Sequence, residues 1–277
     1  MKGKFFAALT LAATLLVTGC GGSDTSKAPA DKGADTKEVT LKIGATPVPH
    51  AELLEQIKTD LKERGINLEV IEFNDYVQPN IALNDKELDA NFFQHEPYLK
   101  DFINEHKDVK LTNAGGIHIE PMGIYSKKIT ALADLPDGAV VSIPNDPTNG
   151  GRALLLLQKA NLLKLKDGAN ETATVQDIAE NPRNLIIQEV EAAQLPRTLE
   201  DVTISIINTN FAMNAELNPM KDALFIEDST SPYVNIIAVR EGDESRAEIK
   251  ALVEALKSDK IKKFITDKYN GAIVPAF

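Results

Sequence analysis

The 277-residue sequence holds one cysteine and no tryptophan, and aromatic residues make up only 5% of it. A single cysteine rules out an intrachain disulfide. No GxSxG, Walker A, GxGxxG, HExxH or CxxC motif occurs either, so serine-nucleophile, nucleotide and zinc-protease chemistry have no support from motifs. We therefore expect a protein that is not an enzyme and that uses no cofactor.

The N-terminus predicts export. Lys2 and Lys4 precede an uncharged apolar run over residues 5–17, which is shorter than the roughly 20 residues of a membrane-spanning helix. The run ends in the motif VTGC, which looks like a bacterial lipobox. We expect cleavage of a lipoprotein signal peptide, residues 1–19, and attachment of a diacylglycerol with palmitate-type chains to Cys20. An ordinary secretory signal with an incidental cysteine is the alternative.

Residues 20–38 are rich in Gly, Ser, Ala, Asp and Lys and hold no large apolar side chain. Such a segment cannot bury enough surface to fold, so it predicts a flexible tether. With two acyl chains on its first residue, it would hold the protein on the extracytoplasmic face of the cell membrane. The formal net charge of −11 argues against binding to nucleic acid or direct adhesion to anionic lipid.

From residue 39 onward, strand-like runs alternate with apolar residues at helical spacing. Leu53, Leu54, Ile57 and Leu61 predict one helix, and Gly65 stops it. Around it we predict strands at 39–44, 68–73 and 89–93 and helices at 77–83 and 96–105. This rhythm is typical of a largely parallel sheet with helices on both faces.

A second unit begins near Pro121. Here we predict strands at 123–125, 139–143, 185–187 and 203–207, and a strongly buried helix that includes the leucines at 154–157, 162, 163 and 165. A strand at 234–239 returns towards the first unit. The C-terminal stretch predicts one long amphipathic helix or two, with the break at Ser258 and Asp259.

The pattern therefore predicts an α/β fold of two lobes joined by two crossings, near residues 117–123 and 228–235. Lobe 1 would comprise 39–120 plus 233–277, and lobe 2 would comprise 121–232. Ligand sites prefer domain interfaces and the carboxyl ends of strands, so we expect a ligand cleft between the lobes. Hinge closure around a small ligand is one way in which such lobes work.

The stretch IPNDPTNGGRALLLL, residues 143–157, carries the most informative local signal. A predicted strand ends, a turn follows, and a helix begins near Asn149 or Gly150, with Asn149 as a favoured N-cap. Arg152 would lie in the first helical turn, where the helix dipole disfavours a cation. This placement favours an anion nearby, because a guanidinium grips a carboxylate through two hydrogen bonds. A surface salt bridge is the alternative.

Two further groups are candidates for a ligand site. Phe92, Phe93 and Tyr98 fall within seven residues. By strand alternation, the two neighbouring phenylalanines point to opposite faces, so at most one points to the core and the other would face an apolar ligand group. The alternative is that these aromatic residues pack in the core. Asn208 follows a predicted strand, and Asn235 lies at the second crossing. Each could bind an ammonium or a carboxylate, or serve as a turn residue.

The histidines raise the questions of metal binding and of catalysis. His118 and Glu120 share one face of a presumed strand, which is a weak indication, so we expect no metal site. His95 with Glu96 or Asp89 keeps open the hypothesis of an anchored hydrolase.

At these residues the sequence resembles the NlpA family of methionine-binding lipoproteins, the receptor components of methionine ABC importers. The resemblance extends over the whole body, in the segments NDYVQPN (74–80), LDANFFQHEPYL (88–99), SKK (126–128), IPNDPTNGGRALLLLQ (143–158), AQLPR (193–197), INT (207–209) and SPYVN (231–235). It implies a two-lobed periplasmic-binding-protein fold without catalysis. The partners would be methionine, an ABC permease and its cytoplasmic ATPase.

The resemblance also implies roles for single residues. Arg152 would hold the ligand carboxylate, Asn208 and Asn235 would hold the carboxylate or the ammonium, and Asn149 would orient the helix start and contact the ligand. The side-chain pocket would be lined by Tyr76, Phe92, Phe93, His95 and Tyr98. The chain departs from many relatives in the second glycine after Asn149 and in Asn210-Phe211-Ala212.

Besides the hydrolase, other functions stay open. The ligand could be a methionine-containing dipeptide or another small amino acid. The protein could also be a non-transport binding lipoprotein, such as an adhesin or a sensor.

Overall fold

The computed structural model describes residues 38–228 and 230–277 of the chain. The predicted signal peptide, Cys20 and the tether up to Lys37 lie outside the described residues. Within the described ranges, no helix is long and apolar enough to cross a membrane.

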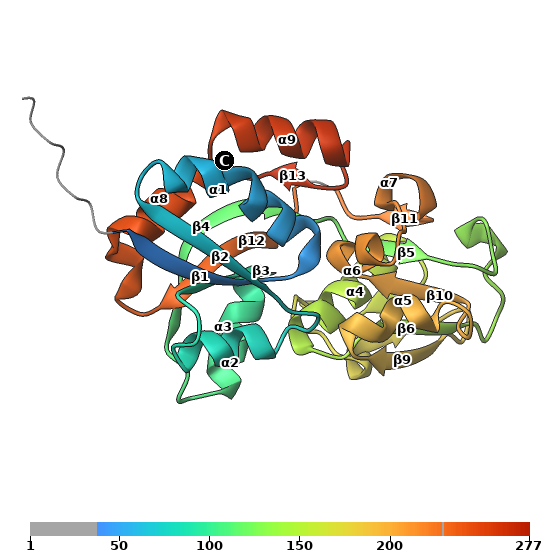
Figure 1. Cartoon of the computed structure of the whole chain (residues 1–277). Helices are drawn as coiled ribbons and strands as arrows, with labels where there is room; N and C mark the ends of the chain where they lie inside the picture. The colour runs from blue at the N-terminus through green and yellow to red at the C-terminus, as the bar shows by residue number, and fades with distance from the viewer. Residues whose placement is uncertain (1–37, 229) are drawn as a thin grey trace, which may run out of the picture. The chain divides into compact units, whose positions relative to one another are not determined.

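Six strands form the first sheet. Their bounds are Val39–Ala45 (β1), Ile66–Glu72 (β2), Ala90–His95 (β3), Leu111–Ile119 (β4), Val234–Arg240 (β12) and Val274–Pro275 (β13). They lie in the order β13-β4-β12-β3-β1-β2. Strands β1, β2 and β3 are parallel, whereas β12 is antiparallel to both β3 and β4. A strand from the C-terminal part of the chain thus lies in the middle of this sheet (Figure 1).

Helices cover both faces of the first sheet. One face carries Pro47–Ala51 (η1), Glu52–Lys62 (α1), Ala247–Leu256 (α8) and Asp259–Tyr269 (α9), with the turn Asp243–Ser245 (η5) before α8. The other face carries Gln78–Asn84 (α2) and Glu96–Glu105 (α3). The four apolar residues that predicted α1 are all fully buried. The predicted C-terminal break is confirmed, because the Ser258 side chain caps α9 by accepting a hydrogen bond from the Ile261 N–H.

Five strands form the second sheet. They are Gly123–Tyr125 (β5), Val140–Pro144 (β6), Ile186–Val190 (β9), Ile204–Ile207 (β10) and Phe225–Ile226 (β11), in the order β11-β5-β10-β6-β9. Its helices are Leu132–Asp134 (η2), Pro147–Lys159 (α4), Val175–Asp177 (η3), Ala192–Gln194 (η4), Leu195–Thr198 (α5), Thr209–Asn214 (α6) and Pro219–Asp222 (α7). Lys164–Leu165 (β7) and Ile178–Glu180 (β8) pair as a separate small ribbon.

The chain passes between the two sheets twice. Residues 120–122 connect β4 to β5, and we call them the first link. The described residues between β11 and β12, 227–228 and 230–233, are called the second link. Both sheets belong to one compact unit, so contacts between the links and either sheet can build a site.

Helix α4 corrects three predictions, the first of which is the N-cap at Asn149. It begins at Pro147, and its cap is Asp146, whose side chain accepts the Asn149 N–H; proline suits the first helical position because its φ is already helical. Arg152 therefore lies in the second turn rather than the first. The helix ends at Lys159, and Asn161 has a positive φ of 58°. The three leucines at 162, 163 and 165 thus lie beyond α4, although all three are buried.

Gly151 allows α4 to pack closely on the loop that precedes η3. A Cβ built on Gly151 would lie 2.3 Å from the carbonyl oxygen of Glu171 and 2.9 Å from the backbone nitrogen of Ala173. Both neighbours are backbone atoms, so a side-chain rotation cannot remove the clash. The second glycine of the Gly150-Gly151 pair is thereby explained by packing.

Replacing Gly151 by alanine should destabilise the fold by about 1–3 kcal/mol, the usual cost of overpacking a tight contact. At an uncrowded helix position the same change stabilises by about 0.5–1 kcal/mol, so the sign is diagnostic. The free energy of unfolding in urea would measure it. Gly150→Ala is the matched control, because its Cβ would meet one backbone oxygen at 3.0 Å and should cost less. A Gly151→Ala protein as stable as the unmodified chain would contradict the packing argument.

Candidate functional site

A narrow cavity of about 20 Å³ lies between elements that belong to the two sheets. Its walls come from the end of β3, the start of α4, the segment after β10, the first link and β12. The lining residues are Tyr76, Phe93, Gln94, His95, Tyr98, Glu120, Asn149, Arg152, Asn208, Thr209, Asn210 and Asn235. Eight of the nine ligand-binding residues predicted from the sequence therefore meet at one place.

The guanidinium of Arg152 is the buried cation of this cavity, with its residue 3% exposed. Its Nε donates to Glu227 Oε1 at 2.9 Å and its Nη2 to Glu227 Oε2 at 2.5 Å. Nη2 also donates to the backbone carbonyl of Glu120 at 2.7 Å, and the guanidinium lies 4.2 Å from the centre of the Tyr233 ring. Burial opposes the charge, but the pairing with Glu227 outweighs it and raises the pKa of Arg152. The salt bridge considered from the sequence thus exists, in the interior rather than at the surface.

The amide side chains of Asn149 and Asn208 extend the polar wall. Asn149 Nδ2 donates to both carboxylate oxygens of Asp146, at 2.9 and 3.0 Å. Asn149 Oδ1 accepts from Asn208 Nδ2 at 2.8 Å and lies 3.1 Å from His95 Nε2. Within the described part of the chain, Asn208 Oδ1 is buried without a hydrogen-bond partner. The cavity therefore presents a free amide acceptor, and leaving such a group unpaired costs about 1–3 kcal/mol.

Aromatic rings line the remaining wall. The ring of Tyr76 lies 5.8 Å from both Phe93 and Tyr98, and 4.8 Å from Phe211. The Tyr98 hydroxyl donates to the Tyr76 carbonyl at 2.9 Å, and the Tyr76 hydroxyl donates to Asn210 Oδ1 at 2.6 Å. Because the polar ends of the tyrosines are already hydrogen-bonded, their rings offer an apolar surface to a ligand.

Phe92 is the exception among the predicted residues. It is fully buried in the core between β1 and helices α1, α8 and α9, and it does not line the cavity. Successive side chains of a strand point to opposite faces, so Phe93 faces the α2–α3 side while Phe92 faces the other. The prediction that Phe92 lines the side-chain pocket is therefore wrong for this cavity.

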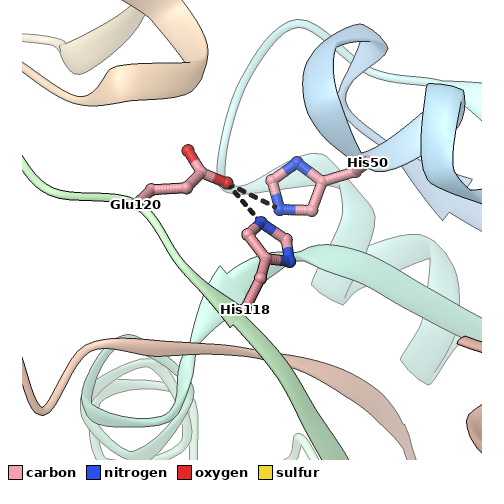
Figure 2. A group of neighbouring side chains, drawn as sticks. All are labelled: His50, His118 and Glu120. Carbon is pink, nitrogen blue, oxygen red and sulfur yellow. Dashed lines mark hydrogen bonds and ion pairs between the residues drawn. The ribbon is translucent and has the colours of Figure 1, made fainter. Parts of the chain in front are cut away.

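Glu120, which lines the cavity, forms a cluster with His50 and His118 that the sequence indicated only in part (Figure 2). His118 Nε2 lies 2.8 Å from Glu120 Oε1, and His50 Nε2 lies 3.2 Å from the same oxygen. His50 comes from η1, far from β4 in the sequence, so spacing could not have placed it here. Glu120, Gln94, Thr209 and Asn210 were also missed as cavity residues, although Gln94 and Thr209 each adjoin a predicted one.

All three members of this cluster are buried. Burial lowers the pKa of His50 to about 4, with Glu120 opposing the shift, and burial lowers the pKa of His118 to about 3. Both imidazoles are therefore neutral at pH 7. Burial also raises the pKa of Glu120, while His50, Arg152 and the backbone N–H of Asn210 oppose that shift.

The cluster could in principle hold a metal, since one ligand atom of each side chain lies within 4.8 Å of the others. However, both Nε2 atoms already lie at hydrogen-bond distance from one carboxylate oxygen. The carboxylate oxygen of Glu120 is therefore already engaged by the two imidazoles.

The contacts of His95 bear on the hydrolase hypothesis. Its Nδ1 accepts from the Tyr98 N–H, and its Nε2 faces Asn149. Burial lowers the pKa of His95 to about 3. Glu96 pairs with Lys100 and Asp89 pairs with Arg246, so neither carboxylate is joined to His95.

Residues 41–277 match the NlpA lipoprotein family. The chain belongs to this family. The methionine-binding lipoprotein MetQ of Bacillus subtilis (strain 168), a relative, is 44% identical over 280 residues, which cover 99% of each chain. The D-methionine-binding lipoprotein MetQ of Escherichia coli (strain K12) is 42% identical over 276 residues, covering 99% of this chain and 98% of the relative.

Solved structures of similar proteins share this fold. A nutrient-binding protein from Burkholderia cenocepacia, bound to methionine, superposes with a TM-score of 0.82 at 49% identity and covers 86% of this chain and 100% of its own. The methionine-binding protein MetQ superposes with a TM-score of 0.83 at 43% identity, covering 86% and 98%. The predicted two-lobed periplasmic-binding-protein fold of this NlpA lipoprotein is thereby confirmed.

The buried histidines predict how stability depends on pH. In the unfolded chain they titrate near pH 6.5, whereas folding holds His50, His95 and His118 neutral. The unfolded state therefore binds more protons below pH 6.5, and the free energy of unfolding should fall as the pH drops from about 6.5 towards 4. The raised pKa of Glu120 acts in the opposite direction.

Replacing His118 by phenylalanine should make this fall shallower by up to about 1.4 kcal/mol per pH unit, because one titrating group is removed. Urea unfolding between pH 4 and 7.5 would measure the slope. The stability difference at pH 7.5, where the buried imidazoles are neutral in both states, serves as the control for packing. Parallel slopes for the two proteins would contradict the prediction.

Proposed function

We propose that this chain is an extracytoplasmic, lipid-anchored solute-binding protein that captures methionine and delivers it to an ABC importer. The observation that carries this proposal is the composition of the cavity. It combines the guanidinium of Arg152 and the amides of Asn149, Asn208 and Asn235 with a wall of three aromatic rings. The relatives named as methionine-binding lipoproteins support the same ligand.

Methionine matches both walls of the cavity. Its carboxylate needs a cation and N–H donors, which Arg152 and the amide groups supply. Its thioether gains roughly 0.3–1.5 kcal/mol against an aromatic ring, and Tyr76, Phe93 and Tyr98 supply the rings. The site thus needs no catalytic group, and we propose that the chain is not an enzyme.

The arrangement of the links supports a receptor that closes around its ligand. We propose lobe 1 at 39–120 plus 233–277 and lobe 2 at 121–232, with the links as the hinge. The partners would be an ABC permease, which receives methionine from the closed form, and its cytoplasmic ATPase. A receptor for a methionine-containing dipeptide, or a non-transport lipoprotein, is the alternative.

Calorimetry on the refolded protein without its signal peptide would test the ligand. We expect L-methionine to bind more tightly than glycyl-methionine, with D-methionine run beside them. Arg152→Ala and Asn235→Ala should each weaken L-methionine binding by about 30-fold or more, since a buried partner of the ligand is lost.

Arg64→Ala is the matched control, because this arginine is exposed and pairs with Glu254 at the surface. It should leave the affinity unchanged. A folded protein that binds none of the three ligands would refute the methionine assignment.

The proposed lipid anchor predicts where the protein fractionates. Cys20→Ser removes the thiol that would carry diacylglycerol, so the chain should leave the membrane fraction and lose the mass of the lipid. Ser26→Ala in the tether is the control and should stay membrane-bound. A Cys20→Ser chain that remains in the membrane fraction would refute an anchor at this residue.

A further inference from the structure

The proposed ligand carries an ammonium group as well as a carboxylate, and the cavity must compensate both charges. Among the described residues that line it, Glu120 is the one carboxylate. It is 6% exposed, so its charge is shielded from solvent. A buried carboxylate is costly unless it is paired, and a ligand cation would pair it.

His50 and His118 position the carboxylate of Glu120. Oε1 of Glu120 lies 2.8 Å from Nε2 of His118 and 3.2 Å from Nε2 of His50. The second carboxylate oxygen is turned away from the two rings (Figure 2). His50 Nδ1 lies 2.7 Å from Thr46 Oγ1, whose hydroxyl can donate to it. That contact favours the tautomer with the proton on Nε2, which faces Glu120.

His118 has the same tautomer for a different reason. Its Nδ1 has no hydrogen-bond partner among the described residues. A proton on Nδ1 would be a buried donor without an acceptor, whereas a proton on Nε2 is donated to Glu120 at 2.8 Å. The N–H of His118 is thus directed at Oε1, whereas the Nε2–H of His50 lies 3.2 Å from Oε1 and bonds Asn235 Oδ1 at 3.1 Å. The hydrogen bond from His118 stabilises the ionised carboxylate.

Two amide oxygens complete a set of acceptors. Asn208 Oδ1 is unpartnered among the described residues, and Asn235 Oδ1 lies 3.1 Å from His50 Nε2, next to Glu120. An ammonium group has three N–H donors and no acceptor. The cavity accordingly presents three acceptors, from Glu120, Asn208 and Asn235, and all three residues line it.

We propose that Glu120, positioned by His50 and His118, accepts the ligand's α-ammonium group and restricts the site to free primary amines. This inference rests on the proposed function and names the feature that the ligand must carry. N-acyl amino acids and dipeptides that place a peptide nitrogen at this point offer one uncharged N–H. They leave the buried carboxylate without a cation.

The test compares ligands on the detergent-solubilised, refolded full mature chain by calorimetry at pH 7.5. The probes are L-methionine, N-acetyl-L-methionine and 4-(methylthio)butanoic acid, which lacks the amino group. We expect the unmodified protein to bind L-methionine at least 30-fold more tightly than either analogue. This comparison needs no variant, so it decides the matter even if a substitution prevents folding.

Glu120→Gln keeps the shape of the side chain and removes its charge. It should weaken L-methionine binding by about 10- to 100-fold, the range of a charge-assisted hydrogen bond, and leave 4-(methylthio)butanoate binding within threefold. Glu254→Gln, an exposed carboxylate of the surface pair with Arg64, is the matched control and should change neither affinity.

The role of His118 in positioning has its own readout. His118→Phe removes one N–H donor, which raises the pKa of Glu120 further, so L-methionine affinity should start to fall at a higher pH than in the unmodified protein. Titrations between pH 5.5 and 8 would show this. The other titratable groups that face Glu120 are Arg152, Tyr76 and Tyr269, whose pKa values are all raised, so none changes charge in this range.

The outcomes separate this inference from the proposed function. If the unmodified protein does not bind L-methionine, the proposed function fails. If it binds L-methionine and the deamino analogue within threefold of each other, or if Glu120→Gln binds L-methionine normally, the role of Glu120 is refuted. L-methionine binding that requires zinc and is abolished by EDTA would refute it too, because the cluster would then hold a metal.

Discussion

A guanidinium taken out of water must have its charge compensated, and this requirement shapes the whole site around Arg152. Helix α4 supplies the arginine from the second sheet. The groups that compensate it come from elsewhere: Glu227 and Tyr233 from the second link, and the Glu120 carbonyl from the first. One side chain is therefore bonded to both segments that join the sheets. A ligand anion that reaches Arg152 contacts a group already attached to both connections.

Glu227 and Glu120, the two glutamates near Arg152, have different partners. Both oxygens of Glu227 face the guanidinium, so this residue neutralises the arginine. The carboxylate of Glu120 instead faces two imidazoles, and only its backbone carbonyl meets Arg152. Opposite charges can thus line one cavity without collapsing into a single ion pair. A zwitterion needs this separation, since its ammonium and carboxylate groups are attached to the same α-carbon.

Sequence patterns predicted what depends on local spacing and missed what depends on long-range packing. The burial of one face of α1 and the break before α9 follow from periodicity and a capping serine. The end of α4 did not, because an apolar run of leucines hides the left-handed Asn161. Alternation showed that Phe92 and Phe93 face opposite ways, but it could not say which one meets the cavity. His50 was missed because its partner Glu120 lies far along the chain, in the first link, and pairing of this kind leaves no local signal.

Strand β12 lies between β3 and β4, although the whole second sheet separates it from them along the chain. Until residues 234–240 have been synthesised, the larger sheet has a gap at its centre. Pairing over such a long loop also costs closure entropy before any contact forms. The strand order therefore delays completion of the first sheet until β12 has been made. A chain that is synthesised from its N-terminus cannot complete this sheet early, and the sheet stays incompletely folded until nearly the whole chain has been made.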